Sequence, residues 1–179
     1  FALDDMTRDD SWRFLMIGRC IERLQFFARS VAGFLRSAAV EDQSALEWLL
    51  ELGNSSITYR TRYLASAQLI PVLDLLLLDE QNPHAVLFQL RTLLRSLERL
   101  GERFELPADL QLRELDHQLS GFNLASLENP LFGRSSVQAV LEGLAELLER
   151  IAGATGEVSD RLGLRFFVHV DASQRTQSS

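Results

Sequence analysis

Three charged residues inside a long apolar segment are the first candidates for chemistry in this sequence. Arg19, Glu22 and Arg23 stand at positions i, i+3 and i+4, so they share one face of a helix that we predict over residues 10–36. Because the rest of this segment is apolar, we expect the charged face to be buried and paired. Truncating a buried, paired Glu22 would then cost about 3–5 kcal/mol.

A second polar cluster contains Tyr59, Arg60 and Arg62, followed by Tyr63. Arginines between tyrosines are suited to holding a carboxylate or a phosphate through charge-assisted hydrogen bonds. The alternative is that these arginines join helices by pairing with acidic residues elsewhere in the chain. The candidate acidic partners are Glu22, Glu47, Glu51 and Asp79.

Composition excludes several classes of function. The chain has 25 acidic and 18 basic residues, a net charge of -7, which argues against non-specific binding of nucleic acid. Every basic residue is an arginine, so lysine Schiff bases and phosphate-loop lysines are excluded. Arginine stays protonated and binds anions rather than acting as a base. We predict no cofactor and no metal site, since the three histidines are far apart in sequence.

The single cysteine, Cys20, cannot form an internal disulfide. Its neighbour Arg19 could lower the thiol pKa and make it reactive, and a small buried core residue is the alternative. With one cysteine, no signal peptide and no apolar run long enough to span a bilayer, we expect a cytoplasmic protein that does not enter membranes.

The hydrophobic spacing predicts an all-α fold, a bundle of about six helices in one domain over residues 1–170. Residues 171–179 are polar and are predicted to be disordered. We expect Gly53-Asn54 to end one helix, a kink or break near Pro71, and Asn82-Pro83 to begin another helix. The predicted helices cover residues 10–36, 44–52, 56–79, 83–104, 108–119 and 135–162.

Several motifs resemble the alpha-E domain, a bacterial all-helical family named for its E-R motif. The resemblance covers roughly the first ninety residues, and it is to the C-terminal portion of the domain. After Asn82-Pro83 the family usually has Arg-Ser, whereas this chain has His84-Ala85. The matching stretches are residues 6–12, 18–23 and 59–63, then 76–79, 82–83 and 88–90.

The resemblance implies an accessory or binding domain of an ATP-grasp amide-ligase system for peptide synthesis or modification. The implied partners are an ATP-grasp protein, fused or neighbouring, and a transglutaminase-like peptidase. The Arg-rich clusters would then bind an anionic group or a partner. Two alternatives are a purely structural or oligomerising bundle and an enzyme with Glu22 as general base. A missing upstream helix would expose apolar surface, so we also expect self-association through the helix at residues 10–36 or the Trp48 helix.

Overall fold

The computed structural model of the protein describes residues 8–128 and 133–166. Within these two ranges the regular elements are all helical, which confirms the predicted all-α bundle. The predicted tail at 171–179 lies outside the described residues. The α-helices are α1 (Arg8–Leu35), α2 (Gln43–Leu52), α3 (Ser56–Tyr63), α4 (Leu69–Leu73), α5 (Val86–Phe104), α6 (Leu110–Ser120) and α7 (Arg134–Phe166).

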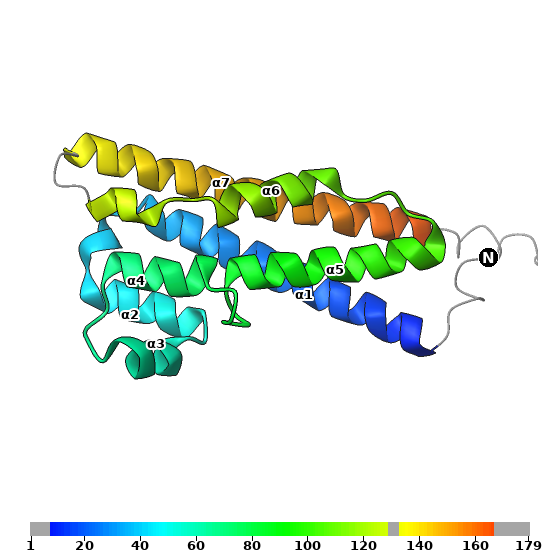
Figure 1. Ribbon diagram of the computed structural model, residues 1–179, viewed down its shortest axis with the longest axis horizontal. Coiled ribbons are helices and arrows are strands. Elements are labelled where there is room, and N and C mark those ends of the chain that lie inside the picture. The colour runs from blue at the N-terminus through cyan, green and yellow to red at the C-terminus, as the bar shows by residue number, and fades with distance from the viewer. Residues whose placement is uncertain (1–7, 129–132, 167–179) are drawn as a thin grey trace, which may run out of the picture.

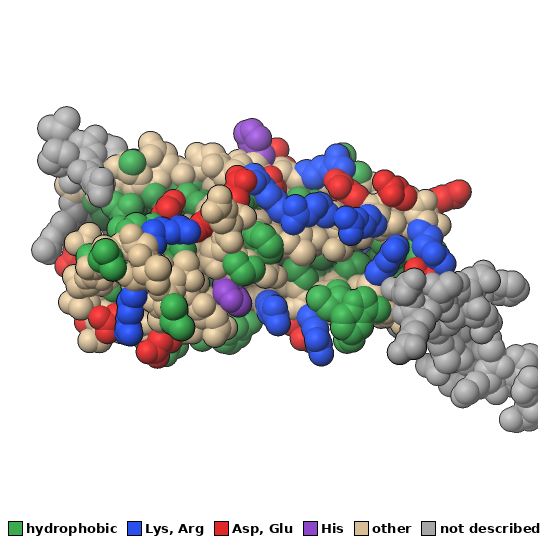
Figure 2. All heavy atoms as spheres, turned by 60° about the horizontal axis from the view of Figure 1, so that its bottom comes forward, with side chains coloured by type: hydrophobic (Ala, Val, Ile, Leu, Met, Phe, Trp, Pro, Cys, Tyr) green, Lys and Arg blue, Asp and Glu red, His purple; other side chains and the backbone are tan. Residues whose placement is uncertain are grey.

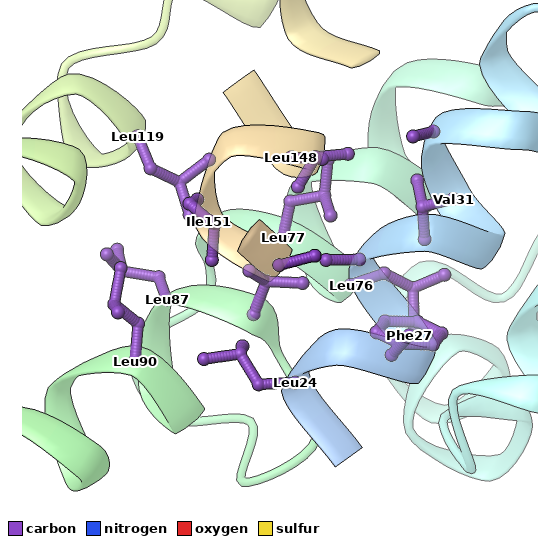
Figure 3. Close-up of a cluster of buried hydrophobic side chains, with 14 of the residues drawn as sticks. Leu24, Phe27, Val31, Leu76, Leu77, Leu87, Leu90, Leu119, Leu148 and Ile151 are labelled. Atoms are coloured by element: carbon purple, nitrogen blue, oxygen red, sulfur yellow. The ribbon is translucent and has the colours of Figure 1, made fainter. Parts of the chain in front are cut away.

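The bundle is elongated, with α1, α5, α6 and α7 along its length and α2, α3 and α4 gathered at one end (Figure 1). The inward side of α1 packs against α7 along much of its length and against α5. Figure 3 shows Leu24 and Phe27 of α1 facing leucines of the neighbouring elements. Fully burying each such side chain stabilises the fold by about 1.5–3 kcal/mol.

The far end of the bundle is joined by an aromatic cluster and an ion pair. The rings of Phe14 and Phe104 each lie against Phe166, with centroids 4.8 Å and 5.1 Å from it. Beside them the Arg103 guanidinium lies 2.7 Å from a carboxylate oxygen of the buried Asp10. These contacts connect the first turns of α1 to the last turns of α5 and α7.

The break expected near Pro71 is present and lies just ahead of the proline. Helix α3 ends at Tyr63, the following Leu64 has a left-handed φ of 48°, and α4 begins at Leu69. Pro71 therefore sits in the first turn of α4, where a backbone N–H would have no helical partner. A π-helical segment, Asp74–Leu78, continues from α4 and buries Leu75, Leu76 and Leu77.

Asn82-Pro83 does not begin a helix, which corrects the sequence prediction. Helix α5 begins three residues later at Val86, after an extended Ala85. Asn82 is buried, and its side-chain amide donates to the Ser55 Oγ at 3.0 Å and the Leu75 carbonyl at 2.9 Å. Its side-chain oxygen accepts from the His84 N–H. Asn82 thus stabilises the turn between the π-helical segment and α5. This role depends on Ser55 and Leu75, which lie elsewhere in the chain.

At the end of α2, Gly53 and Asn54 have different roles. Asn54 has the left-handed backbone, with φ of 48°, whereas Gly53 has an ordinary φ of -82°. Gly53 is required for space instead, because a Cβ there would lie 2.6 Å from Leu76 Cδ2 and 2.9 Å from Phe27 Cζ. The glycine therefore allows the end of α2 to approach the core closely.

We predict that Gly53→Ala destabilises the fold by about 1–3 kcal/mol, the usual cost of overpacking a filled core. Gly153→Ala on α7 is the matched control, because a Cβ at Gly153 meets no atom within 4 Å. That control should stabilise the fold by about 0.5–1 kcal/mol, since alanine favours a helix over glycine. Urea unfolding of both variants measures the difference, and equal effects would contradict this role for Gly53.

Candidate functional site

The charged face of α1 is exposed, which corrects the expectation that it is buried. Arg19, Glu22 and Arg23 all lie on the surface, and none of them forms an ion pair within the described part of the chain. Large apolar side chains flank them on the same face. We call this surface the α1 stripe, formed by Trp12, Leu15, Met16, Arg19, Glu22, Arg23 and Phe26.

The position of α1 between its neighbours explains why this face is open. Helices α7 and α5 cover its inward sides, and the stripe lies on the side that they leave uncovered. Trp12 and Phe26 are 59% and 60% exposed, so the apolar residues of α1 extend past the core. Figure 2 shows hydrophobic side chains among arginines on this side of the molecule. In the sequence, the seven-residue spacing of Trp12, Arg19 and Phe26 is the signal that could have identified this surface.

Two hollows border the stripe, and they divide its charged residues between them. Arg19 and Glu22 line a hollow of about 580 Å³ between α1 and the end of α7. Arg23 lines a smaller one of about 260 Å³, on the side of α2 and α5. A larger hollow, about 910 Å³, lies elsewhere, between α5, α6 and α7.

The smaller hollow, which we call the Arg23 hollow, has a lining without carboxylates. Its polar side chains are Arg23, Asn54, His84 and Gln89, set among apolar groups that include Phe26 and Phe27. Three further hollows in the described part of the chain each include acidic residues, namely Glu22, the pair Glu47 and Glu51, and the set Glu98, Glu102 and Asp109. In a chain of net charge -7, the Arg23 hollow is therefore a locally favourable place for an anion.

Local structure holds the polar groups of the Arg23 hollow in place. The Asn82 turn positions His84, whose N–H donates to the Asn82 side chain at 3.1 Å. Gln89, in the first turn of α5, donates to the Pro83 carbonyl. His84 was not among the site residues chosen from sequence, because only the folded turn brings it close to α1.

Cys20 is a buried core residue, so the reactive-thiol alternative is wrong. Its Sγ lies 3.3 Å from the Gln89 carbonyl, to which it donates. Burial raises the pKa of the Cys20 thiol to about 11, although the charge of Arg23 acts in the opposite direction. Arg19, the residue considered from sequence, makes no contribution to this shift.

The second predicted cluster lies on α3 and shares no hollow with the α1 stripe. The Tyr59 ring is buried, and its hydroxyl donates to the Ser66 carbonyl and accepts from the Gln68 N–H. Arg62 pairs with Asp79 at 2.5 Å, which confirms the ion-pairing alternative for this residue. Arg60 is exposed at the rim of a recess of about 40 Å³. Tyr59 and Arg62 thus connect α3 to the segments that follow it.

The pKa of Asp79 lies below its ordinary value. Burial acts to raise the pKa, but the hydrogen bond from the Gln81 N–H and the pairing with Arg62 outweigh it. The same pairing raises the pKa of Arg62. Both groups are therefore charged at neutral pH and fix the turn at residues 79–82 to α3.

The fold and the α1 stripe together define an all-helical domain with an exposed Glu-Arg pair on its central helix. The chain belongs to the Alpha-E family, described as a predicted alpha-helical domain with a conserved ER motif, which matches residues 1–167. Glu22-Arg23 is the Glu-Arg pair of the α1 stripe. No solved structure matches the chain.

Three curated relatives are uncharacterized proteins, one from Mycobacterium bovis and two from Mycobacterium tuberculosis. Each is 29% identical over 165 residues, which is 90% of this chain. The chain spans 18% of the length of these relatives.

No helix in the described ranges is both long enough and apolar enough to cross a bilayer. No group of three or more histidine, cysteine or acidic residues in the same ranges could hold a metal ion.

We predict that Arg62→Ala destabilises the fold by about 1 kcal/mol at neutral pH, since the Arg62 side chain is 41% exposed. The pKa of Asp79 is depressed in the folded chain, so the stabilisation from this ion pair is present above the ordinary carboxyl range. That stabilisation is lost as the pH falls through the pKa that Asp79 has in the folded chain. The difference from the unmodified chain should therefore shrink as the pH falls below the ordinary carboxyl range. Urea unfolding across this pH range measures it, with the neighbouring Arg60→Ala as control. A difference independent of pH would contradict the assignment.

We predict that Glu22→Ala changes the free energy of unfolding by less than about 0.5 kcal/mol, because the side chain is exposed. Leu24→Ala on the same helix should cost about 2–5 kcal/mol, as Leu24 is buried. Chemical unfolding at low protein concentration compares the two. A loss for Glu22→Ala as large as that for Leu24→Ala would show that the carboxylate supports the core.

Proposed function

We propose that this chain is a binding domain of an ATP-grasp amide-ligase system that synthesises or modifies peptides. The Arg23 hollow receives an anionic group of the ligase's substrate or intermediate. The surrounding α1 stripe, with Arg19 and Glu22, supplies contacts to the molecule that carries that group. The observation that carries this proposal is the lining of the Arg23 hollow, which contains an arginine, a histidine and two amides and no carboxylate.

The size of the hollow limits what it can hold. Ligand pockets usually measure about 300–1,000 Å³, and the Arg23 hollow measures about 260 Å³. It therefore suits one carboxylate or phosphate group of a larger molecule. The guanidinium of Arg23 offers a planar pair of N–H donors to such a group, and amide N–H groups can add further hydrogen bonds.

The chemistry of amide ligation supplies groups of this kind. ATP-grasp ligases activate a carboxylate as an acyl phosphate before an amine attacks it, so both the substrate and the intermediate are anionic. The resemblance to the alpha-E domain provides the link to such a ligase. A chain whose basic residues are all arginines is suited to holding these anions and has no lysine to attack them.

The test measures binding and ATP turnover after the purified chain is mixed with an ATP-grasp protein, the partner that the resemblance implies. We expect complex formation and a change in turnover, and we expect Arg23→Ala to weaken both by about tenfold, as loss of a charged hydrogen bond does. Arg99→Ala is the matched control, because Arg99 is exposed on α5 and outside the Arg23 hollow.

Three other results would change the proposal. Neither a complex nor a change in turnover would favour the structural bundle. Equal losses of binding in the Arg23→Ala and Arg99→Ala variants would show that the contact lies outside the Arg23 hollow. A turnover change that Glu22→Gln removes without weakening the complex would favour the enzyme with Glu22 as general base.

A further inference from the structure

The α1 stripe carries two rows of residues with the same seven-residue spacing. Trp12, Arg19 and Phe26 form the first row, and Leu15, Glu22 and Arg29 form the second, three residues further along. All six side chains are exposed. Rows at this spacing are the pattern by which one helix packs along another as a coiled coil. The two rows are exposed over about 25 Å of α1, given the rise of 1.5 Å per residue.

The pattern is complementary to itself when a second copy of α1 runs antiparallel. In that arrangement the first row of one copy lies opposite the second row of the other. A twofold axis between residues 20 and 21 then places Arg19 opposite the second copy's Glu22, and Glu22 opposite its Arg19. The same axis sets Phe26 opposite Leu15, so an apolar layer lies on each side of the two ion pairs.

Residues further from the twofold axis pair in the same antiparallel register. Trp12 lies opposite Arg29 of the second copy, and a guanidinium over an indole ring is a favourable cation–π contact. Gly18 lies opposite Arg23, and a Cβ built on Gly18 meets no atom within 4 Å, so there is room beside it. A parallel arrangement would instead place Arg19 against Arg19, a like-charge contact that opposes association.

We propose that the chain forms a twofold dimer through antiparallel packing of its α1 stripes, with reciprocal pairing of Arg19 and Glu22 at the centre. The contact is isologous, since each residue of one row meets its counterpart on the other copy. The exposed Trp12, Leu15 and Phe26 supply the apolar burial, and the charges set the register and the direction. This inference goes beyond the proposed function and does not rest on it.

Charge exchange at the centre of the contact gives a specific test. Sedimentation equilibrium should show a dimer for the unmodified chain. Arg19→Glu and Glu22→Arg should each shift it to monomer, raising the dissociation constant by about tenfold or more, because like charges then face each other. The double variant should recover the dimer. An equimolar mixture of the two single variants should form a heterodimer, since both reciprocal pairs are then oppositely charged.

Controls separate this contact from loss of folding and from other interfaces. Circular dichroism should show unchanged helix content in every variant, because both positions are exposed. Arg99→Glu on α5 should leave the dimer intact. A monomeric unmodified chain would overturn the proposal, and so would a dimer that both single charge reversals leave intact. Loss of the dimer in the single variants, without recovery in the double variant or the mixture, would overturn the antiparallel register.

Discussion

The packing of α1 against α7 and α5 is the contact on which the rest of the structure depends. Leu24, Phe27, Ala28, Val31 and Leu35 on its inward side are all buried. Leu76 of the π-helical segment lies beside Phe27 (Figure 3). Because α1 crosses the whole length of the bundle, its orientation determines which of its remaining residues face outward (Figure 1). The exposed stripe and both hollows beside it follow from that single orientation.

An ion pair and a turn fix this arrangement at two places. Arg103 and Asp10 connect the start of α1 to the end of α5, next to the phenylalanine cluster. At the turn before α5, the side chain of Asn82 donates to Ser55 and to the Leu75 carbonyl. The second contact matters for the site, because it places His84 at the Arg23 hollow.

The proposed anion site and the proposed dimer overlap on α1, because Arg19 and Glu22 would contact either the bound molecule or the second copy. The antiparallel contact uses the rows from Trp12 to Arg29, in which Arg19 and Glu22 meet their counterparts. Arg23 lies at the edge of the stripe, where it borders the hollow with His84 and faces Gly18 of the second copy.

The sequence by itself determined the helical class, approximate helix positions and the absence of lysine chemistry. These follow from local periodicity and from residue type, which do not depend on distant contacts. Tertiary structure decided that Arg19, Glu22 and Arg23 face solvent, since a helix that is apolar on most sides does not reveal which side its neighbours leave uncovered. It also decided that Arg62 pairs with Asp79, that Asn82 holds a turn, and that His84 lines the same hollow as Arg23. Each of these depends on segments far apart in the chain, which only the packing of the helices brings together.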